Sequence, residues 1–163
     1  MPINRMLRRI PLAALTFLFF ITFPTSPSGQ DVNTPTHILN AQEKAFSNYS
    51  KDFRALEGSL KGVDFEGVEF LDNVATTADD RLYSATVMFD MYDSISCQSD
   101  REKVRPLLKK QLLAFSWLMD QEADRTAGFL QFVTLPAAAQ MGLRMKDDLR
   151  TTKDKLNTIA GSL

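Results

Sequence analysis

Acidic side chains dominate one segment of the chain. Between Asp64 and Asp93 there are eight carboxylates and one base, Arg81. Five of these acids recur at helical steps of three, four and seven residues, which would place them on one face of a helix: Glu69, Asp72, Asp79, Asp90 and Asp93. Such a face could dock a basic partner or hold divalent cations. We favour the alternative, a solvated face partly balanced by the bases between Arg101 and Lys110 on the neighbouring helix, because the acids lack the clustered turn of a calcium site.

The residue types most often used in catalysis are scarce. The chain has one histidine, His37, and one cysteine, Cys97. A di-iron bundle needs Glu-x-x-His pairs, c-type haem needs Cys-x-x-Cys-His and structural zinc needs several thiolates or imidazoles, and the sequence supplies none of these sets. Glycine-rich phosphate loops, G-x-S-x-G and HExxH are also missing from it. We therefore expect a non-enzymatic protein without a cofactor or a metal.

Cys97 falls in a predicted turn between two helices. A turn cysteine of an exported protein can form an intermolecular disulfide, which would make the protein a dimer. The alternative, which we prefer, is a partly buried small apolar residue in a monomer. With a single cysteine no intramolecular disulfide can form, so the hydrophobic core must stabilise the fold unaided.

An uncharged stretch of eighteen residues runs from Thr126 to Leu143. Gln131 and a central proline, Pro136, argue against a membrane span, so we interpret the stretch as the corner between two helices. The sharper hypothesis is an apolar corner that contacts a membrane surface or a partner protein. Its candidate contact residues are Phe129, Leu130, Phe132 and Leu135.

These residues must be positioned by helices, because apolar side chains recur with heptad spacing and no segment alternates with period two. We predict four amphipathic helices, beginning near Pro35, Asp64, Ser99 and Pro136, which fit an all-α, antiparallel four-helix bundle of up-down-up-down topology. The predicted inner positions are Leu39, Phe46, Phe53 and Leu60 in the first helix; Val68, Leu71, Ala75, Ala78, Leu82, Ala85, Phe89 and Tyr92 in the second; Leu108, Leu112, Phe115, Met119, Thr126 and Phe129 in the third; and Leu135, Ala138, Gly142, Met145, Leu149, Thr152, Leu156, Ile159 and Leu163 in the fourth.

The predicted helix ends rest on capping residues. Thr34 before Pro35 and Thr134 before Pro136 each offer a hydroxyl followed by an early proline. Ser99 and Glu102 have the spacing of a capping box. Pro106 removes a hydrogen bond from the third helix, so we expect a kink or a fresh helix start there.

Residues 1–29 have the order of a secretory signal peptide, with three arginines, an uncharged run over residues 10–23 and then small residues up to Gly29. The fourteen apolar residues would rise about 21 Å as a helix, less than the roughly 30 Å of membrane hydrocarbon. We therefore expect cleavage after Ser28 or Gly29, an uncleaved anchor being the alternative. A linker over 30–34 and a bundle domain over 35–163 would follow.

Loss of the three arginines with residues 1–29 changes the formal net charge from −1 to −4, which argues against nucleic-acid binding. Our leading hypothesis is an exported (periplasmic or secreted) helical bundle acting through contacts with an unidentified protein or a membrane surface. The alternatives are a small-molecule or lipid-binding extracytoplasmic bundle and a sensor-like ligand-binding bundle.

Overall fold

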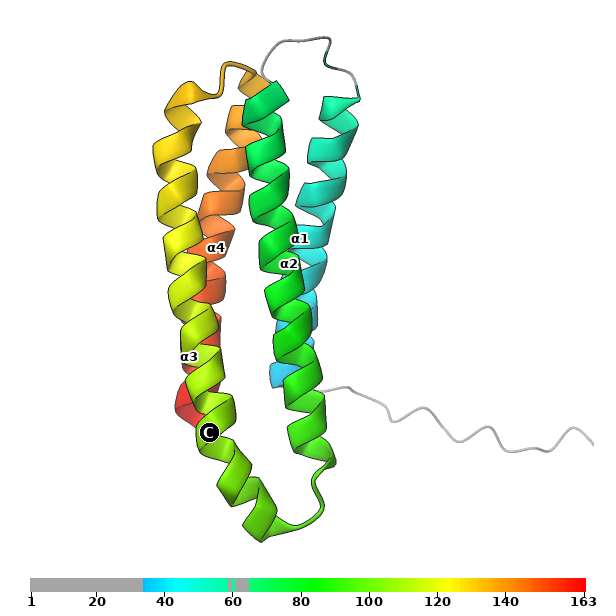
Figure 1. Ribbon diagram of the computed structural model, residues 1–163, viewed down its shortest axis with the longest axis vertical. Coiled ribbons are helices and arrows are strands. Elements are labelled where there is room, and N and C mark those ends of the chain that lie inside the picture. The colour runs from blue at the N-terminus through cyan, green and yellow to red at the C-terminus, as the bar shows by residue number, and fades with distance from the viewer. Residues whose placement is uncertain (1–33, 59, 61–64) are drawn as a thin grey trace, which may run out of the picture. The chain divides into compact units, whose positions relative to one another are not determined.

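The computed structural model describes residues 34–58, 60 and 65–163. These residues contain no strand, and Figure 1 shows their four long helices side by side, so the prediction of an all-α helical bundle is confirmed. The expected signal segment and residues 30–33 of the linker lie outside the described residues. The elements are α1 (Pro35–Glu57), α2 (Phe65–Ser94), α3 (Gln98–Phe129), the 3₁₀ helix η2 (Leu130–Phe132) and α4 (Pro136–Ser162).

Polar contacts connect each helix to two neighbours, so that the four helices form a ring in the order α1, α2, α3, α4. Successive helices run in opposite directions in Figure 1. The contacts around the ring are Ser50 Oγ to Asp72 Oδ1 at 2.5 Å, Arg81 Nη1 to Glu122 Oε1 at 3.4 Å, Ser116 Oγ to the Lys153 carbonyl at 3.2 Å, and Tyr49 Oη to Asp148 Oδ2 at 2.7 Å.

Most of the predicted inner positions are buried and form one core. All eight inner positions of α2 are buried, as are those of α3 except Phe129. Leu60, Phe129, Leu135 and Leu163 are partly buried and pack against this core. The heptad pattern therefore predicted which face of each helix turns inward.

The start of α1 confirms its predicted cap, because Thr34 Oγ1 accepts a hydrogen bond from the His37 amide at 3.3 Å and Pro35 is the first helical residue. The helix ends at Glu57, before the last of its predicted inner positions, Leu60. Gly58 occupies the C-cap, and its amide donates to the Arg54 carbonyl at 3.1 Å.

The predicted caps of the third and fourth helices are wrong. Cys97 is the N-cap of α3, so Ser99 already lies inside the helix and the capping box does not form. Leu135, not Thr134, is the N-cap of α4, and its side chain makes no capping hydrogen bond. The main-chain carbonyls of Cys97 and Leu135 accept the first hydrogen bonds of these helices instead.

Pro106 lies within a single continuous helix, so α3 does not restart there. In Figure 1 the first turns of α3 lean toward the C-terminal end of α2, in agreement with the expected kink. Both helices continue past the first turn of α1 and the last turn of α4. Thr36 of α1 donates to Asp90 of α2 at 3.2 Å, which marks the level at which α1 begins. We call residues 91–107 the hairpin end.

Candidate functional site

The acidic residues of α2 do not form one uniform outer face. Asp72 is partly buried against α1, where it accepts hydrogen bonds from Ser50 and from Arg54 Nε at 3.0 Å. Asp90 accepts from Thr36, while Glu69 and Asp93 are exposed. A large part of the predicted docking face is thus engaged by α1.

Three of the expected counterions, Arg101, Lys103 and Arg105, bond to groups other than the carboxylates of α2. Arg101 donates to the main-chain oxygens of Ile95 and Asp93, at 2.7 and 2.5 Å. Asp72 forms an ion pair with Arg54 of α1. Asp72 and Asp90 are thus bonded to α1, and the partial balance of the acidic face by residues 101–110 stays a prediction.

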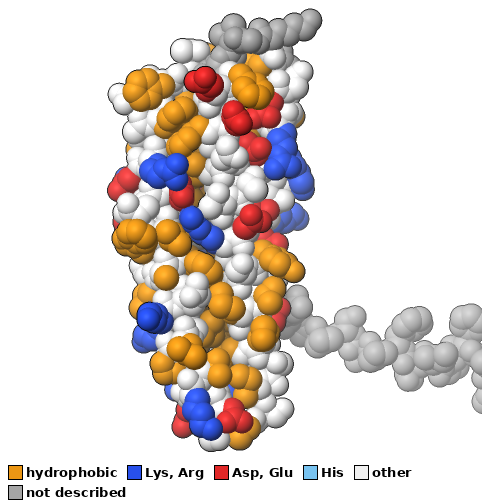
Figure 2. All heavy atoms as spheres, in the orientation of Figure 1, with side chains coloured by type: hydrophobic (Ala, Val, Ile, Leu, Met, Phe, Trp, Pro, Cys, Tyr) orange, Lys and Arg blue, Asp and Glu red, His pale blue; other side chains and the backbone are white. Residues whose placement is uncertain are grey.

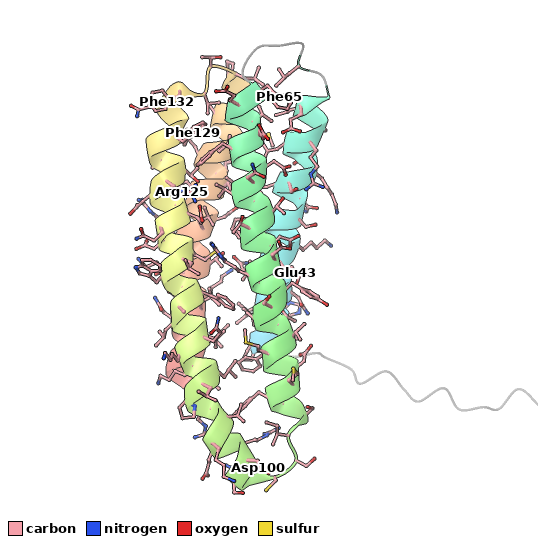
Figure 3. All side chains as sticks on the ribbon, in the orientation of Figure 1. Glu43, Phe65, Asp100, Arg125, Phe129 and Phe132 are labelled. Carbon is pink, nitrogen blue, oxygen red and sulfur yellow. The ribbon has the colours of Figure 1, made fainter. Side chains whose placement is uncertain are left out.

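A second carboxylate of the predicted face, Asp79, lies near Glu43 of α1. Burial raises the pKa of Asp79, and the neighbouring charge of Asp80 adds to the rise while Lys51 opposes it. Burial and then the charge of Asp79 raise the pKa of Glu43, which lies midway along the bundle in Figure 3. Asp79 Oδ1 is buried and has no hydrogen-bond partner among the described residues. The described part of the chain contains no group of three or more side chains that could hold a metal ion.

A buried ion pair between α2 and α3 was missed at the sequence level. Glu122 is buried and accepts from Arg125 at 2.9 Å and from Arg81 at 3.4 Å. The guanidinium of Arg125 also lies over the ring of Phe70, at 5.5 Å from its centroid. The sequence does indicate that Glu122 is buried, because it follows the inner residue Phe115 by seven positions. This site positions two helices rather than offering a reactive group to solvent.

The predicted apolar corner is largely packed. Phe129 stacks on Phe70 with centroids 4.0 Å apart, and Leu130 is partly buried beside Gly142 of α4. Leu135 is also partly buried. Only Phe132 of the four candidate residues is well exposed, at 66%, and its ring makes an edge-type contact with that of Phe129, with centroids 6.1 Å apart. Figure 3 shows Phe65, Phe129 and Phe132 at the end of the bundle opposite Asp100.

An opening lies between α2 and α3, next to the hairpin end. We call it the apolar groove. It has a volume of about 540 Å³. Two large side chains at its edge are well exposed, Met91 at 65% and Leu107 at 68%. Figure 2 shows hydrophobic side chains gathered on this face of the bundle, in the half nearer the hairpin end. The lining residues are Met88, Met91, Tyr92, Ser94, Ile95, Val104, Leu107, Leu108 and Gln111.

The groove was not among the predicted sites, although its pattern can be found in the sequence. Met88, Met91 and Ile95 have steps of three and four residues, and so do Val104, Leu107 and Gln111. Each set forms a second stripe beside the inner one. The inner heptads were stronger and explained the fold alone, so this second stripe was overlooked.

Cys97 is exposed at the start of α3, so its predicted partial burial is wrong. Its Sγ lies 3.3 Å from Ser99 Oγ. That hydrogen bond, with the amides of Asp100 and Ser99, lowers the pKa of the thiol. The exposure is compatible with an intermolecular disulfide, which stays a prediction.

Within the described residues, no helix combines the length and the hydropathy that a membrane span requires. Comparison of the chain with family models, with curated proteins and with solved structures finds no match. The site must therefore be interpreted from its own geometry.

Proposed function

We propose that this chain is an exported, non-enzymatic protein with the up-down-up-down four-helix bundle fold, and that it acts by binding another protein through the apolar groove. The exposure of Met91 and Leu107 carries the proposal. Leaving large apolar side chains in water is unfavourable by about 25 cal/mol per Å², and a contiguous apolar patch of this kind is typical of an interaction surface. Methionines also suit such a surface because they adapt their shape to a partner.

The groove is a better contact surface than the two predicted ones. Asp72 and Asp90 of the acidic residues already bond to α1, and a partner would have to replace those bonds. At the corner, Phe132 offers one exposed ring, which is less than a protein or membrane contact usually needs. The groove instead presents apolar side chains from two helices on one face.

The other parts of the proposal rest on the sequence. The order of residues 1–29 supports export, and these residues lie outside the described part of the chain. The non-enzymatic part is supported by the scarcity of histidine and cysteine and by the missing catalytic motifs. Mass spectrometry of the protein recovered outside the cytoplasm tests export: we expect a mature chain beginning at Gly29 or Gln30. A full-length chain retained in the cytoplasm would contradict it.

Affinity capture from the exported fraction tests the groove. The test variant carries Met91→Ser and Leu107→Ser. The control variant carries Leu113→Ser and Trp117→Ser, two exposed apolar residues of α3 that do not line the groove. We expect the unmodified protein and the control to retain the same partner and the test variant to lose it, with all three melting within a few degrees of one another. Retention by the test variant would show that the contact lies elsewhere.

The same groove gives one observation in favour of the lipid-binding alternative. Its volume of about 540 Å³ lies within the usual 300–1,000 Å³ of small-ligand pockets. Thermal unfolding with added palmitate tests this: a ligand that binds the folded protein raises the melting temperature with concentration. A rise that disappears with Met91→Ser and Leu107→Ser would favour lipid, and no rise would favour a protein partner.

A further inference from the structure

The methionines of the described residues differ widely in exposure. Met119 and Met145 are fully buried. Met88 and Met141 are partly buried and pack against the core. Of the methionines that the structure describes, only Met91 is well exposed, at 65%. An oxidant dissolved in water reaches an exposed thioether directly, whereas a closely packed core excludes it. We therefore expect Met91 to be the first of these methionines to be oxidised.

Met91 lies at the edge of the apolar groove, one turn of α2 after Met88. Leu107 of α3 is the other well exposed residue of the lining, at 68%. The described residues that line the groove include none with a charged side chain. A partner in the groove must therefore gain its affinity from the burial of apolar surface, and Met91 supplies one of the two most exposed side chains for it.

We propose that Met91 is a site of reversible oxidation that regulates binding in the groove, with hydrogen peroxide as the oxidant. The sulfur lone pair of Met91 attacks one peroxide oxygen, the O–O bond breaks, and proton transfer to the leaving oxygen gives water and methionine sulfoxide. Sulfur loses two electrons and the peroxide gains them. A methionine sulfoxide reductase with a dithiol as reductant restores the thioether and gives a disulfide and water. The proposal rests on the proposed function, because it names the regulation of the same groove.

Oxidation of Met91 changes the binding surface and leaves the fold intact. The sulfoxide adds a polar oxygen to the edge of the groove. A partner that covers Met91 with apolar side chains leaves this oxygen without a hydrogen bond, which weakens binding by about tenfold. Met91 does not belong to the core, and it is not among the partly buried residues that pack against the core. The free energy of unfolding of the single chain should therefore hardly change.

Titration of the full chain with hydrogen peroxide, followed by peptide mapping in a mass spectrometer, tests the site. The Cys97→Ser variant serves as the background, because the exposed Cys97 thiol also reacts with peroxide. We expect the sulfoxide of Met91 to form at peroxide concentrations that leave Met119 and Met145 unmodified, with unchanged far-UV circular dichroism. Oxidation of the buried methionines together with Met91 or before it would overturn the proposal.

Binding of the dye 1-anilinonaphthalene-8-sulfonate, which reports exposed hydrophobic surface, tests the regulation. In the same background we expect the affinity for the dye to fall about tenfold once Met91 is oxidised and to return after treatment with methionine sulfoxide reductase and dithiothreitol. Met91→Leu conserves the side-chain volume and should bind the dye equally before and after peroxide. The matched control Met88→Leu, one turn away in the same groove, should stay sensitive to peroxide. A loss of binding that persists in Met91→Leu, or that Met88→Leu prevents, would overturn the proposal.

The capture experiment separates this inference from the proposed function. If the variant with Met91→Ser and Leu107→Ser loses the partner but the protein oxidised at Met91 retains it, the groove is the contact surface and only the regulation is wrong. If the double variant retains the partner, the contact lies elsewhere and both are wrong. Loss of the partner by both proteins, with recovery after reduction of the sulfoxide, is the expected result.

Discussion

Gly142 is the position at which one added methyl group tests the packing of α4 against α2 and η2. A Cβ on Gly142 would lie 2.6 Å from Cδ2 of Leu130 and 3.1 and 3.2 Å from the two Cδ atoms of Leu71. Carbon atoms normally approach to about 3.5–4.0 Å, so the overlap with Leu130 is about 1 Å. Leu130 is partly buried and can shift, but Leu71 is fully buried and has little room to do so.

The expected effect of Gly142→Ala is a balance of two terms. Overpacking a core costs about 1–3 kcal/mol, and alanine in place of glycine inside a helix returns about 1 kcal/mol. We expect a net loss of about 1 kcal/mol in the free energy of unfolding, which lowers the melting temperature by about 3 °C in a domain of this size. Gly128→Ala is the control, since no atom lies within 4 Å of its added Cβ. That variant should gain up to about 1 kcal/mol.

Thermal and urea unfolding followed by far-UV circular dichroism measure both variants. A third variant, Gly142→Ala with Leu130→Ala, removes the side chain that overlaps most. Its loss should be smaller than the sum of the two single losses, because the added methyl group then fills space vacated by leucine. If Gly142→Ala and Gly128→Ala raised the melting temperature equally, the close approach of α4 to η2 would be refuted.

Three further predictions concern the core and its charged groups. Leu82→Asp should abolish helical structure at room temperature, because an unpaired buried carboxylate costs several kcal/mol against a stability of about 5–15 kcal/mol; unchanged melting would show that the register of α2 is wrong. Glu122→Ala should lower the free energy of unfolding by about 1–3 kcal/mol, since Arg81 loses its carboxylate partner. The control Asp124→Ala removes an exposed ion pair and should change the free energy of unfolding by less than about 0.5 kcal/mol. Equal losses for the two variants in urea unfolding would contradict this prediction. Asp79→Asn should stabilise the protein at pH 7. Burial raises the pKa of Asp79 and of Glu43 above the ordinary values of 3.8 and 4.5. The stability that these two groups contribute is therefore present below those values and is lost as the pH rises through the raised pKa. The same stabilisation at pH 3.5 and pH 7 would count against it.

The inner face of each helix could be predicted because the heptad pattern encodes burial directly. Val68, Leu82 and Phe89 are buried as their spacing requires. The helix ends could be predicted less well, since several hydroxyls near an end can serve as the N-cap. Ser99 and Thr134 had suitable side chains, but the main-chain geometry begins the helices after Cys97 and Leu135.

Contacts between helices depend on which helices are neighbours and on how each is rotated, and a single sequence gives neither. The acidic side of α2 was recognised, but its cover by Arg54 and Ser50 of α1 follows only from the packed structure. The same holds for Glu122, whose partner Arg81 lies 41 residues away in the chain. Its spacing from Phe115 placed it on the inner face, where a carboxylate requires such a partner.

The two sides of the hairpin end differ in a way that favours the groove as a contact surface. Beyond the first turn of α1, the inner side of α2 and α3 is covered by arginines: Arg101 lies 5.5 Å from the ring centroid of Tyr92, and Arg105 bonds to the hydroxyl of the same residue. On the outer side, Met91 and Leu107 remain exposed. The contacts of Arg101 and Arg105 with Tyr92 show that charged side chains can cover the apolar side chains at the point where the bundle ends. The apolar outer side is therefore unnecessary for closing the fold of one chain, and a partner that covers it gives it a physical reason.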